Sequence, residues 1–220
     1  MSARPTRLDV RADPEGAASA AVQHVRAGGL IAYPTETVYG VGGGTSEEAV
    51  AGLRRLKSRE PGKPFLLLVD SMDAVRGLRW TDAARELART FWPGSLTLVL
   101  EDPLGIFPPW VCDAGKGAVG VRMSPHPVVA RLVAELGALT STSLNEPGEA
   151  PATSASDAVE VVRRLGGGGV LVLDAGTLPP SGPSTVVDCT GAEPVVIREG
   201  TIPTSRLRCV APGVHAREST

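Results

Sequence analysis

Helical and extended hydrophobic patterns alternate along most of the chain. Apolar residues recur every three or four positions over residues 17–27, and Gly28-Gly29 ends this helix. The same spacing predicts further helices over residues 46–56, 81–91, 127–135 and 156–165, with Ser46 and Ser156 as N-caps. Short apolar runs predict strands over residues 30–33, 65–69, 96–100, 118–122, 139–143, 170–173, 185–188 and 195–198. Some of these strands are separated only by loops, so we expect an α/β fold with a mixed sheet.

The length of 220 residues fits one domain, and no stretch is long enough to act as a linker. We expect a flexible N-terminal arm over residues 1–15, the folded domain over residues 16–207, and a weakly structured tail over residues 208–220. Apolar residues make up 42% of the chain and aromatic residues only 4%, so leucine, valine and alanine have to fill the core.

Charge and cysteine content narrow the class of protein. The formal net charge of −2 offers no global basic field for nucleic acid, so any anion site has to be built locally. Cys112, Cys189 and Cys209 are too scattered for a metal-ligand spacing or a disulfide framework. The first nine residues lack the apolar core of a signal peptide, and the apolar runs are too short to span a membrane. We therefore expect a soluble cytoplasmic protein with reduced thiols and no metal site.

Two polar segments in the first half of the chain could carry chemistry. Tyr33–Gly40 and Gly42–Gly44 combine polar side chains with turn formers, which suits either a ligand cleft or a plain strand-to-helix connection. Lys57, Arg59 and Lys63 lie directly before a buried strand. Proline and glycine break the helix here, so the three cations can converge on a polyphosphate, and we favour this anion site over a solvated basic loop.

Two further segments lie in the second half. Ser141, Ser143 and Asn145 would point to one face of a strand end, either to bind a polar ligand or as part of a polar edge strand. Ser184 follows a turn, and Arg198 ends a strand. Arg198 could cap a phosphate, although the segment alone favours a surface ion pair.

Other reaction classes find little support. A Ser-His-Asp triad would need His24, His126 or His215, and no Gly-x-Ser-x-Gly elbow is present. The sequence contains neither the glycine-lysine signature of a phosphate-binding loop nor a dinucleotide fingerprint placed between a strand and a helix. The scattered histidines and cysteines do not form a zinc spacing.

Taken in order, the polar segments resemble the signature of the YrdC-type threonylcarbamoyl-AMP synthase family, in its short single-domain form. The resemblance extends from about residue 17 to residue 202. The matching segments are Pro34–Val41, Lys57–Pro64, Trp92–Thr97, Val121–His126, Ser141–Asn145, Pro183–Asp188 and Arg198–Gly200. Each segment alone is moderately specific, whereas seven in register are highly specific.

The resemblance implies a fold and a reaction. The fold is a twisted mixed α/β sheet with flanking helices around a large concave, positive cavity. The reaction forms threonylcarbamoyl-AMP and pyrophosphate from L-threonine, bicarbonate or CO2, and ATP with Mg2+. A carbamate made on the threonine nitrogen attacks the α-phosphate, so no side-chain nucleophile is needed. The product is handed to a tRNA threonylcarbamoyl-transferase complex, with weak or indirect contact to the tRNA.

The resemblance also implies roles for individual residues. The catalytic pair is Lys57 and Arg59. The ATP-binding residues are Lys57, Arg59, Lys63, Ser143, Asn145 and Arg198. The threonine-binding residues are Thr35, Arg122, Ser141 and Ser184, with Arg122 pairing with the substrate carboxylate.

Four sites depart from the family pattern, one of them Pro147, where the family commonly has a serine before the glycine. Glu60 adds a negative charge beside the phosphate site, Ser124 replaces a usual proline, and Leu144 replaces a usual small residue. Ser124 and Leu144 keep open a second hypothesis, a related carbamoyl- or acyl-adenylate-forming enzyme with a different acceptor. A third hypothesis is a non-catalytic RNA-binding module, which the net charge disfavours.

Overall fold

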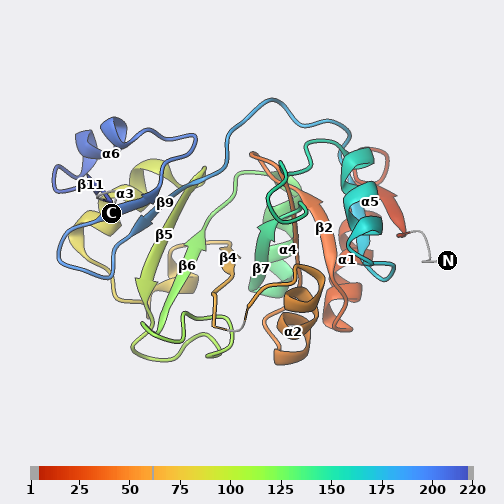
Figure 1. Ribbon diagram of the computed structural model, residues 1–220, viewed down its shortest axis with the longest axis horizontal. Coiled ribbons are helices and arrows are strands. Elements are labelled where there is room, and N and C mark those ends of the chain that lie inside the picture. The colour runs from red at the N-terminus through yellow and green to blue at the C-terminus, as the bar shows by residue number, and fades with distance from the viewer. Residues whose placement is uncertain (1–4, 61, 218–220) are drawn as a thin grey trace.

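All the predicted strands form, and they belong to one mixed sheet (Figure 1). The structure is a computed structural model that describes residues 5–60 and 62–217. Within these residues the strands follow the spatial order β1-β8-β2-β3-β7-β4-β6-β5-β9-β10-β11. Their bounds are β1 Arg7–Asp9, β2 Ile31–Pro34, β3 Tyr39–Gly42, β4 Leu66–Val69, β5 Leu96–Glu101, β6 Ala118–Arg122, β7 Ala138–Ser143, β8 Leu171–Asp174, β9 Thr185–Asp188, β10 Val195–Arg198 and β11 His215–Ala216. Parallel and antiparallel pairs both occur, as expected for a mixed sheet.

The predicted helices also form, with small shifts at their ends. Their bounds are α1 Pro14–Arg26, α2 Glu47–Leu56, α3 Asp82–Phe91, α4 Pro127–Leu136 and α5 Ala155–Arg164, to which the structure adds a short 3₁₀ turn at Asp73–Val75 and α6 Thr204–Val210. Ser46 caps α2 as predicted, because its hydroxyl accepts from the amide of Ala49. The predicted cap of α5 is wrong: Ser154, not Ser156, accepts from the amide of Asp157 at 3.1 Å. Ser154 has the extended backbone that a cap requires, and Ser156 already lies in the first turn.

Alternation along the strands places two hydrophobic layers on opposite faces of the sheet. Ile31 and Tyr33 of β2 and Leu68 of β4 pack with α1 and α4. The intervening residues Ala32 and Leu67 pack in the second cluster, which contains side chains of α2 and α5. Leucine, valine and alanine dominate both layers, as the composition predicts. Figure 1 shows α3 and α6 at the β9 end of the sheet and α5 at the opposite end.

The first and last segments are more ordered than expected. Arg7–Asp9 pairs in parallel with β8, and Asp13 caps a helix that already begins at Pro14. At the other end, α6 continues past residue 207 and β11 pairs with β10. β1 and β11 are too short to show an apolar period in the sequence. Each forms only because the edge of a neighbouring strand is available for pairing. Residues 1–4 and 218–220 lie outside the described part of the chain.

The Tyr33–Gly44 segment contains a strand that the hydrophobic pattern did not predict. β3 pairs antiparallel with β2 and with β7. A side chain at Gly42 would lie 1.6 Å from the carbonyl oxygen of Thr140 in β7, so only glycine fits there. This glycine therefore serves close strand packing rather than the approach to a ligand.

No helix of the described residues is long and apolar enough to cross a membrane.

Candidate functional site

The residues singled out in the sequence fall into three groups. The first, the lysine cluster, consists of Lys57, Ser143 and Asn145. Lys57 caps the end of α2, and its ammonium donates to the side-chain oxygen of Asn145 at 3.0 Å and to the backbone oxygen of the same residue. The hydroxyl of Ser143, the last residue of β7, donates to the same side-chain oxygen at 2.8 Å. Burial, together with the nearby charge of Arg59, lowers the pKa of Lys57 to about 8.

Arg59 adjoins the lysine cluster but is held by other partners. The guanidinium lies over the ring of Phe65, 4.9 Å from its centroid, and donates to the carbonyl of Pro64 at 2.7 Å. Its Nε is buried and has no hydrogen-bond partner among the described residues. Burial and the charge of Arg54 lower its pKa from the ordinary value. Arg59 therefore retains donor capacity for an anion.

Lys63 does not join this group. Its ammonium forms an ion pair with Glu60 at 2.7 Å, and both side chains are more than half exposed. Glu60, whose negative charge was expected beside the phosphate site, is therefore paired with Lys63 instead.

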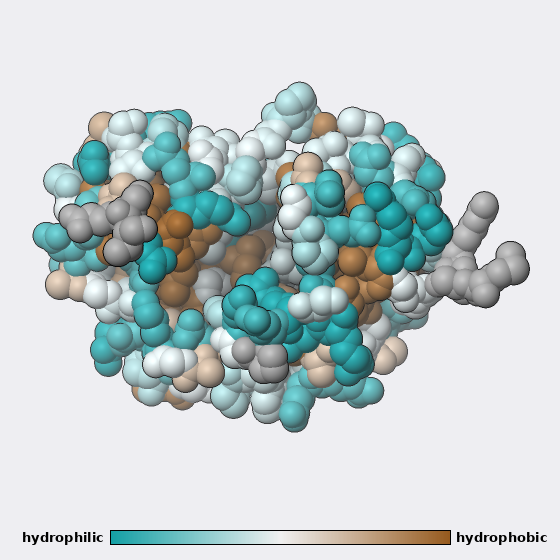
Figure 2. All heavy atoms as spheres, viewed as in Figure 1, coloured by the Kyte–Doolittle hydropathy of each residue, from teal (hydrophilic) through white to brown (hydrophobic). Residues whose placement is uncertain are grey.

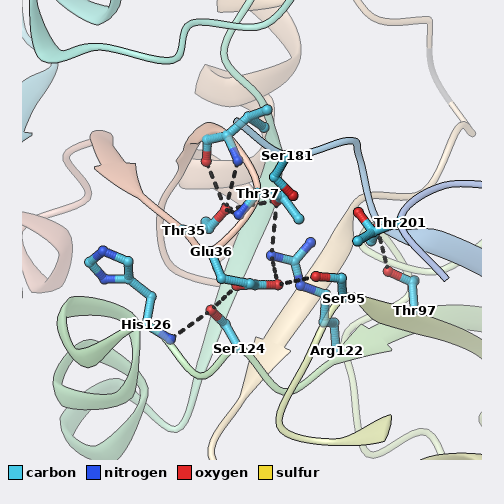
Figure 3. A network of polar contacts seen from close by, with 12 residues as sticks. Thr35, Glu36, Thr37, Ser95, Thr97, Arg122, Ser124, His126, Ser181 and Thr201 are labelled. Atoms are coloured by element: carbon cyan, nitrogen blue, oxygen red, sulfur yellow. Dashed lines mark hydrogen bonds and ion pairs between the residues drawn. The ribbon is translucent and has the colours of Figure 1, made fainter. Parts of the chain in front are cut away.

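The second group, the arginine cluster, consists of Glu36, Ser95, Arg122 and Ser124. Figure 3 shows the carboxylate of Glu36 between the other three side chains. It accepts from Nη2 of Arg122 at 2.9 Å, from Ser124 at 2.5 Å and from Ser95 at 3.3 Å. Arg122 is 4% exposed, and its Nε is also without a partner among the described residues. The antiparallel pairing of β5 and β6 places the end of β6 beside the start of β5, which brings Arg122 and Ser124 close to Ser95.

The third group, the Arg198 cluster, consists of Thr97, Ser184 and Arg198. Arg198 donates to the carbonyl of Ser184 through Nε at 3.2 Å and Nη2 at 2.9 Å, and to its hydroxyl at 3.1 Å. The hydroxyl of Thr97 lies 3.0 Å from that of Ser184. Burial, followed by the charge of Arg122, lowers the pKa of Arg198. The second and third groups are therefore close enough to interact electrostatically.

Thr35 and Ser141 are both buried, and the hydroxyl of Thr35 is bonded within its own turn. The hydroxyl of Thr35 accepts from the amides of Thr37 and Val38 and donates to the carbonyl of Val38 at 2.7 Å, so it builds the turn before β3. Ser141 is 6% exposed and lies beside Tyr33. Burial raises the pKa of Tyr33, while a hydrogen bond with Ser141 and the charge of Arg122 act in the opposite direction.

Two of the remaining departures from the family pattern have clear structural roles. Ser124 donates to Glu36. Leu144 is fully buried in the core, and its amide donates to the carbonyl of Tyr39 in β3. Glu36, Ser95 and Thr97 were not assigned from the sequence. Glu36 carries the best signal among them, because a carboxylate lies within the polar segment that follows β2.

Figure 2 shows that this face of the molecule is hollowed near its centre, between the part with α6 and β9 and the part with α5. A separate cavity of about 550 Å³ lies in the β5–β6 connection and is lined by Ile106, Phe107 and Trp110. None of the predicted site residues lines that cavity. The large positive cavity stays a prediction.

Proteins of one known family are similar to this chain in sequence and in fold. The Sua5/YciO/YrdC family model, described as "Telomere recombination", matches residues 23–200. A Mycobacterium tuberculosis protein provisionally named a threonylcarbamoyl-AMP synthase is 38% identical over 202 residues, covering 89% of this chain and 91% of the relative. The threonylcarbamoyl-AMP synthase of Pyrococcus abyssi is 34% identical over 191 residues, covering 84% of this chain and 54% of the relative.

Among solved structures, that of P. abyssi Sua5 complexed with L-threonine superposes with a TM-score of 0.85 at 30% sequence identity. The match covers 96% of this chain and 62% of that one, so the chain spans less than two thirds of the archaeal protein. The fold and the family resemblance predicted from the sequence are both confirmed. With a family model that extends over most of its length and relatives of this similarity, the chain belongs to the Sua5/YciO/YrdC family.

Proposed function

We propose that this chain is an L-threonylcarbamoyladenylate synthase, a nucleotidyltransferase that forms threonylcarbamoyl-AMP and pyrophosphate from L-threonine, bicarbonate or CO2, and ATP. The observation that carries the proposal is the lysine cluster. In this cluster Lys57, at the end of α2, and Ser143, at the end of β7, both donate to the side-chain oxygen of Asn145. Arg122, buried at the end of β6, and Arg198, which ends β10 and donates to Ser184, supply further positive charge. The relatives' names and the threonine complex of P. abyssi Sua5 support the same activity.

The lysine cluster and Arg59 would bind the nucleotide. A carbamate oxygen attacks the α-phosphorus, a new oxygen–phosphorus bond forms, and the bond to the β-phosphate breaks so that pyrophosphate leaves with the electron pair. Negative charge on the phosphates increases in this step, and Lys57 and Arg59 would stabilise it. Mg2+ enters with ATP as part of the substrate. Lys63 would join only after exchanging its ion pair with Glu60 for a phosphate.

Arg122 would bind the carboxylate of threonine, because its buried Nε lacks a partner among the described residues. Ser141 and Ser184 would line the same pocket, and Arg198 would reach the nucleotide from Ser184. Thr35 would contribute the shape of its turn rather than a free hydroxyl, since that hydroxyl is already bonded to the turn. The active site would thus hold two anions that repel each other, each paired with its own cation.

The product is a mixed anhydride that water can hydrolyse, which favours direct hand-over to a tRNA threonylcarbamoyl-transferase complex in the cytoplasm. The net charge of −2 supports weak or indirect tRNA contact rather than tight binding by this chain. The burial of Leu144 and the support that Ser124 gives to Glu36 favour structural roles for both residues, which weakens the case for a different acceptor.

The test is pyrophosphate release by the purified protein with Mg2+-ATP, bicarbonate and a panel of amino acids. We expect release that depends on threonine, and its loss in Lys57→Ala and Arg59→Ala variants that stay folded. Lys116→Ala is the matched control, because Lys116 pairs with Asp188 outside the predicted site. Release with another acceptor only would support the related enzyme. No release together with steeply salt-dependent RNA binding would support the RNA-binding module.

A further inference from the structure

The Glu36–Arg122 ion pair is held by segments that are distant in sequence. Glu36 comes from the β2–β3 connection and Arg122 from the end of β6, 5% exposed in its side chain. Ser95, before β5, and Ser124, after β6, complete the set of donors to the carboxylate. A buried ion pair is costly to form unless further hydrogen bonds satisfy it, and these two serines provide them. The carboxylate therefore has a fixed position.

Both partners of the pair retain unused hydrogen-bonding capacity. A carboxylate has about four lone-pair sites, and the contacts to Glu36 use three of them. The side chain of Glu36 is 17% exposed, so the carboxylate is still reachable. Nε of Arg122 is buried without a partner in the described part of the chain. An acceptor and a donor of opposite charge thus lie next to each other, and each has one hydrogen-bonding position that the described residues do not use.

This arrangement matches a zwitterion rather than a simple carboxylate. A ligand carboxylate at Arg122 alone would be repelled by the charge of Glu36, whereas an α-ammonium group beside that carboxylate would be attracted to it. We propose that Glu36 binds the amino group of the amino-acid substrate and positions it, and so selects α-amino acids over other carboxylates. This inference rests on the proposed function and adds a recognition residue to it.

The same contact serves the carbamate. When the ammonium reacts with bicarbonate, the nitrogen loses two protons, one to the water that leaves and one to solvent. The carbamate nitrogen keeps one hydrogen, which can donate to Glu36, while the two carbamate oxygens carry the negative charge. Repulsion from Glu36 turns these oxygens away from its own carboxylate. Glu36 would therefore orient the carbamate for attack without taking part in bond making.

The alternative is that Glu36 only neutralises Arg122. The two roles differ in one measurable quantity, the ratio of affinities for threonine and for 2,3-dihydroxybutanoate, in which a hydroxyl replaces the amine. If Glu36 only neutralises Arg122, Glu36→Gln changes both affinities by the same factor. If Glu36 binds the amine, only threonine is affected.

Titration calorimetry of the full chain with both ligands, without ATP, makes this comparison. We expect Glu36→Gln to weaken threonine binding by about tenfold or more, while the affinity for 2,3-dihydroxybutanoate stays constant or rises. Ser124→Ala, which removes one supporting donor, should weaken threonine binding by a smaller factor and leave the analogue unaffected. Glu101→Gln is the matched control, because Glu101 pairs with Arg79 elsewhere on the sheet. Thermal unfolding and the affinity for an ATP analogue check that each variant is folded.

Equal losses for both ligands in Glu36→Gln would overturn the inference and leave the proposed function intact. So would unchanged threonine binding in that variant. A wild-type protein that binds neither threonine nor the analogue would overturn the proposed function and the inference together. Should Glu36→Gln unfold, Ser124→Ala decides: selective loss of threonine binding supports the inference, and its absence contradicts it.

Discussion

The ammonium nitrogen of Lys57 lies 3.0 Å from the side-chain oxygen of Asn145, 88 residues later in the chain. Burial and the charge of Arg59 lower the pKa of this lysine to about 8, from an ordinary value of 10.5. A phosphate binds the protonated form, so ATP affinity should fall by up to about tenfold per pH unit above pH 8. Calorimetric titrations of ATP from pH 7 to pH 10 test this, and in Lys57→Met the slope over this window should disappear.

The same pKa shift predicts a change in stability. Between pH 8 and pH 10.5 the unfolded chain binds more protons at Lys57 than the folded chain does. The free energy of unfolding contributed by this group therefore rises with pH across that window. Denaturant unfolding of the wild type and Lys57→Met isolates the contribution as the difference between two pH profiles. A difference that falls with rising pH would contradict the assigned burial.

The Arg198 cluster leads to a prediction about threonine binding. Ser184→Ala removes a hydroxyl that contacts both Thr97 and Arg198, so we expect the KM for threonine to rise about tenfold. Thr97→Val keeps the shape of the side chain and leaves Ser184 bonded to Arg198, so a smaller rise is expected. Pyrophosphate release measures both values. Equal KM values for the wild type and Ser184→Ala would remove Ser184 from the threonine pocket.

Glu60 offers a test of the predicted role of Lys63, because the ion pair between the two residues is solvent-exposed. Glu60→Gln frees the ammonium for a phosphate and should lower the KM for ATP at low salt, with the effect lost at about 1 M salt. The unfolding free energy should not change measurably. Glu160→Gln, which breaks a similar exposed pair with Arg163 on α5, is the control and should leave the KM unaltered.

Leu144 allows a prediction about stability, because the family pattern usually has a small residue at this position. The side chain is fully buried in the core, so Leu144→Ala should destabilise the protein by about 2–5 kcal/mol, although it restores the common residue type. Denaturant unfolding measures the loss. If Leu144→Ala has the unfolding free energy of the wild type but uses a different amino-acid acceptor, Leu144 instead shapes the substrate pocket.

The first strand gives the last prediction. Nε of Arg7 donates to the carboxylate of Asp174 at 2.5 Å, and Asp174 is 1% exposed. Arg7→Met leaves this buried carboxylate without its cation, so a loss of about 1–3 kcal/mol in unfolding free energy is expected. Arg89→Met is the control, since Arg89 on α3 pairs with Glu86 in solvent. Equal stability of both variants would mean that residues 7–9 contribute little to the fold.

Local pattern by itself determined most of the helices and strands and the family resemblance. The apolar period of α3 and the run that forms β6 can be read within one short window, because burial on one face repeats every 3.6 or every 2 residues. The capping role of Ser46 likewise depends only on its immediate neighbours. The ordered polar segments identified the family from residue types alone.

Partners across the fold were decided only by the tertiary structure. No local period relates Glu36 to Arg122, or Lys57 to Asn145, because strand order and register bring these side chains together. β1 and β11 depend in the same way on an edge to pair with. Lys63 shows the limit most clearly: three cations close in sequence look alike, yet one turns to Glu60 in solvent while Lys57 is partly buried beside β7. Desolvation and pairing, which distinguish these charges, exist only after the chain has folded.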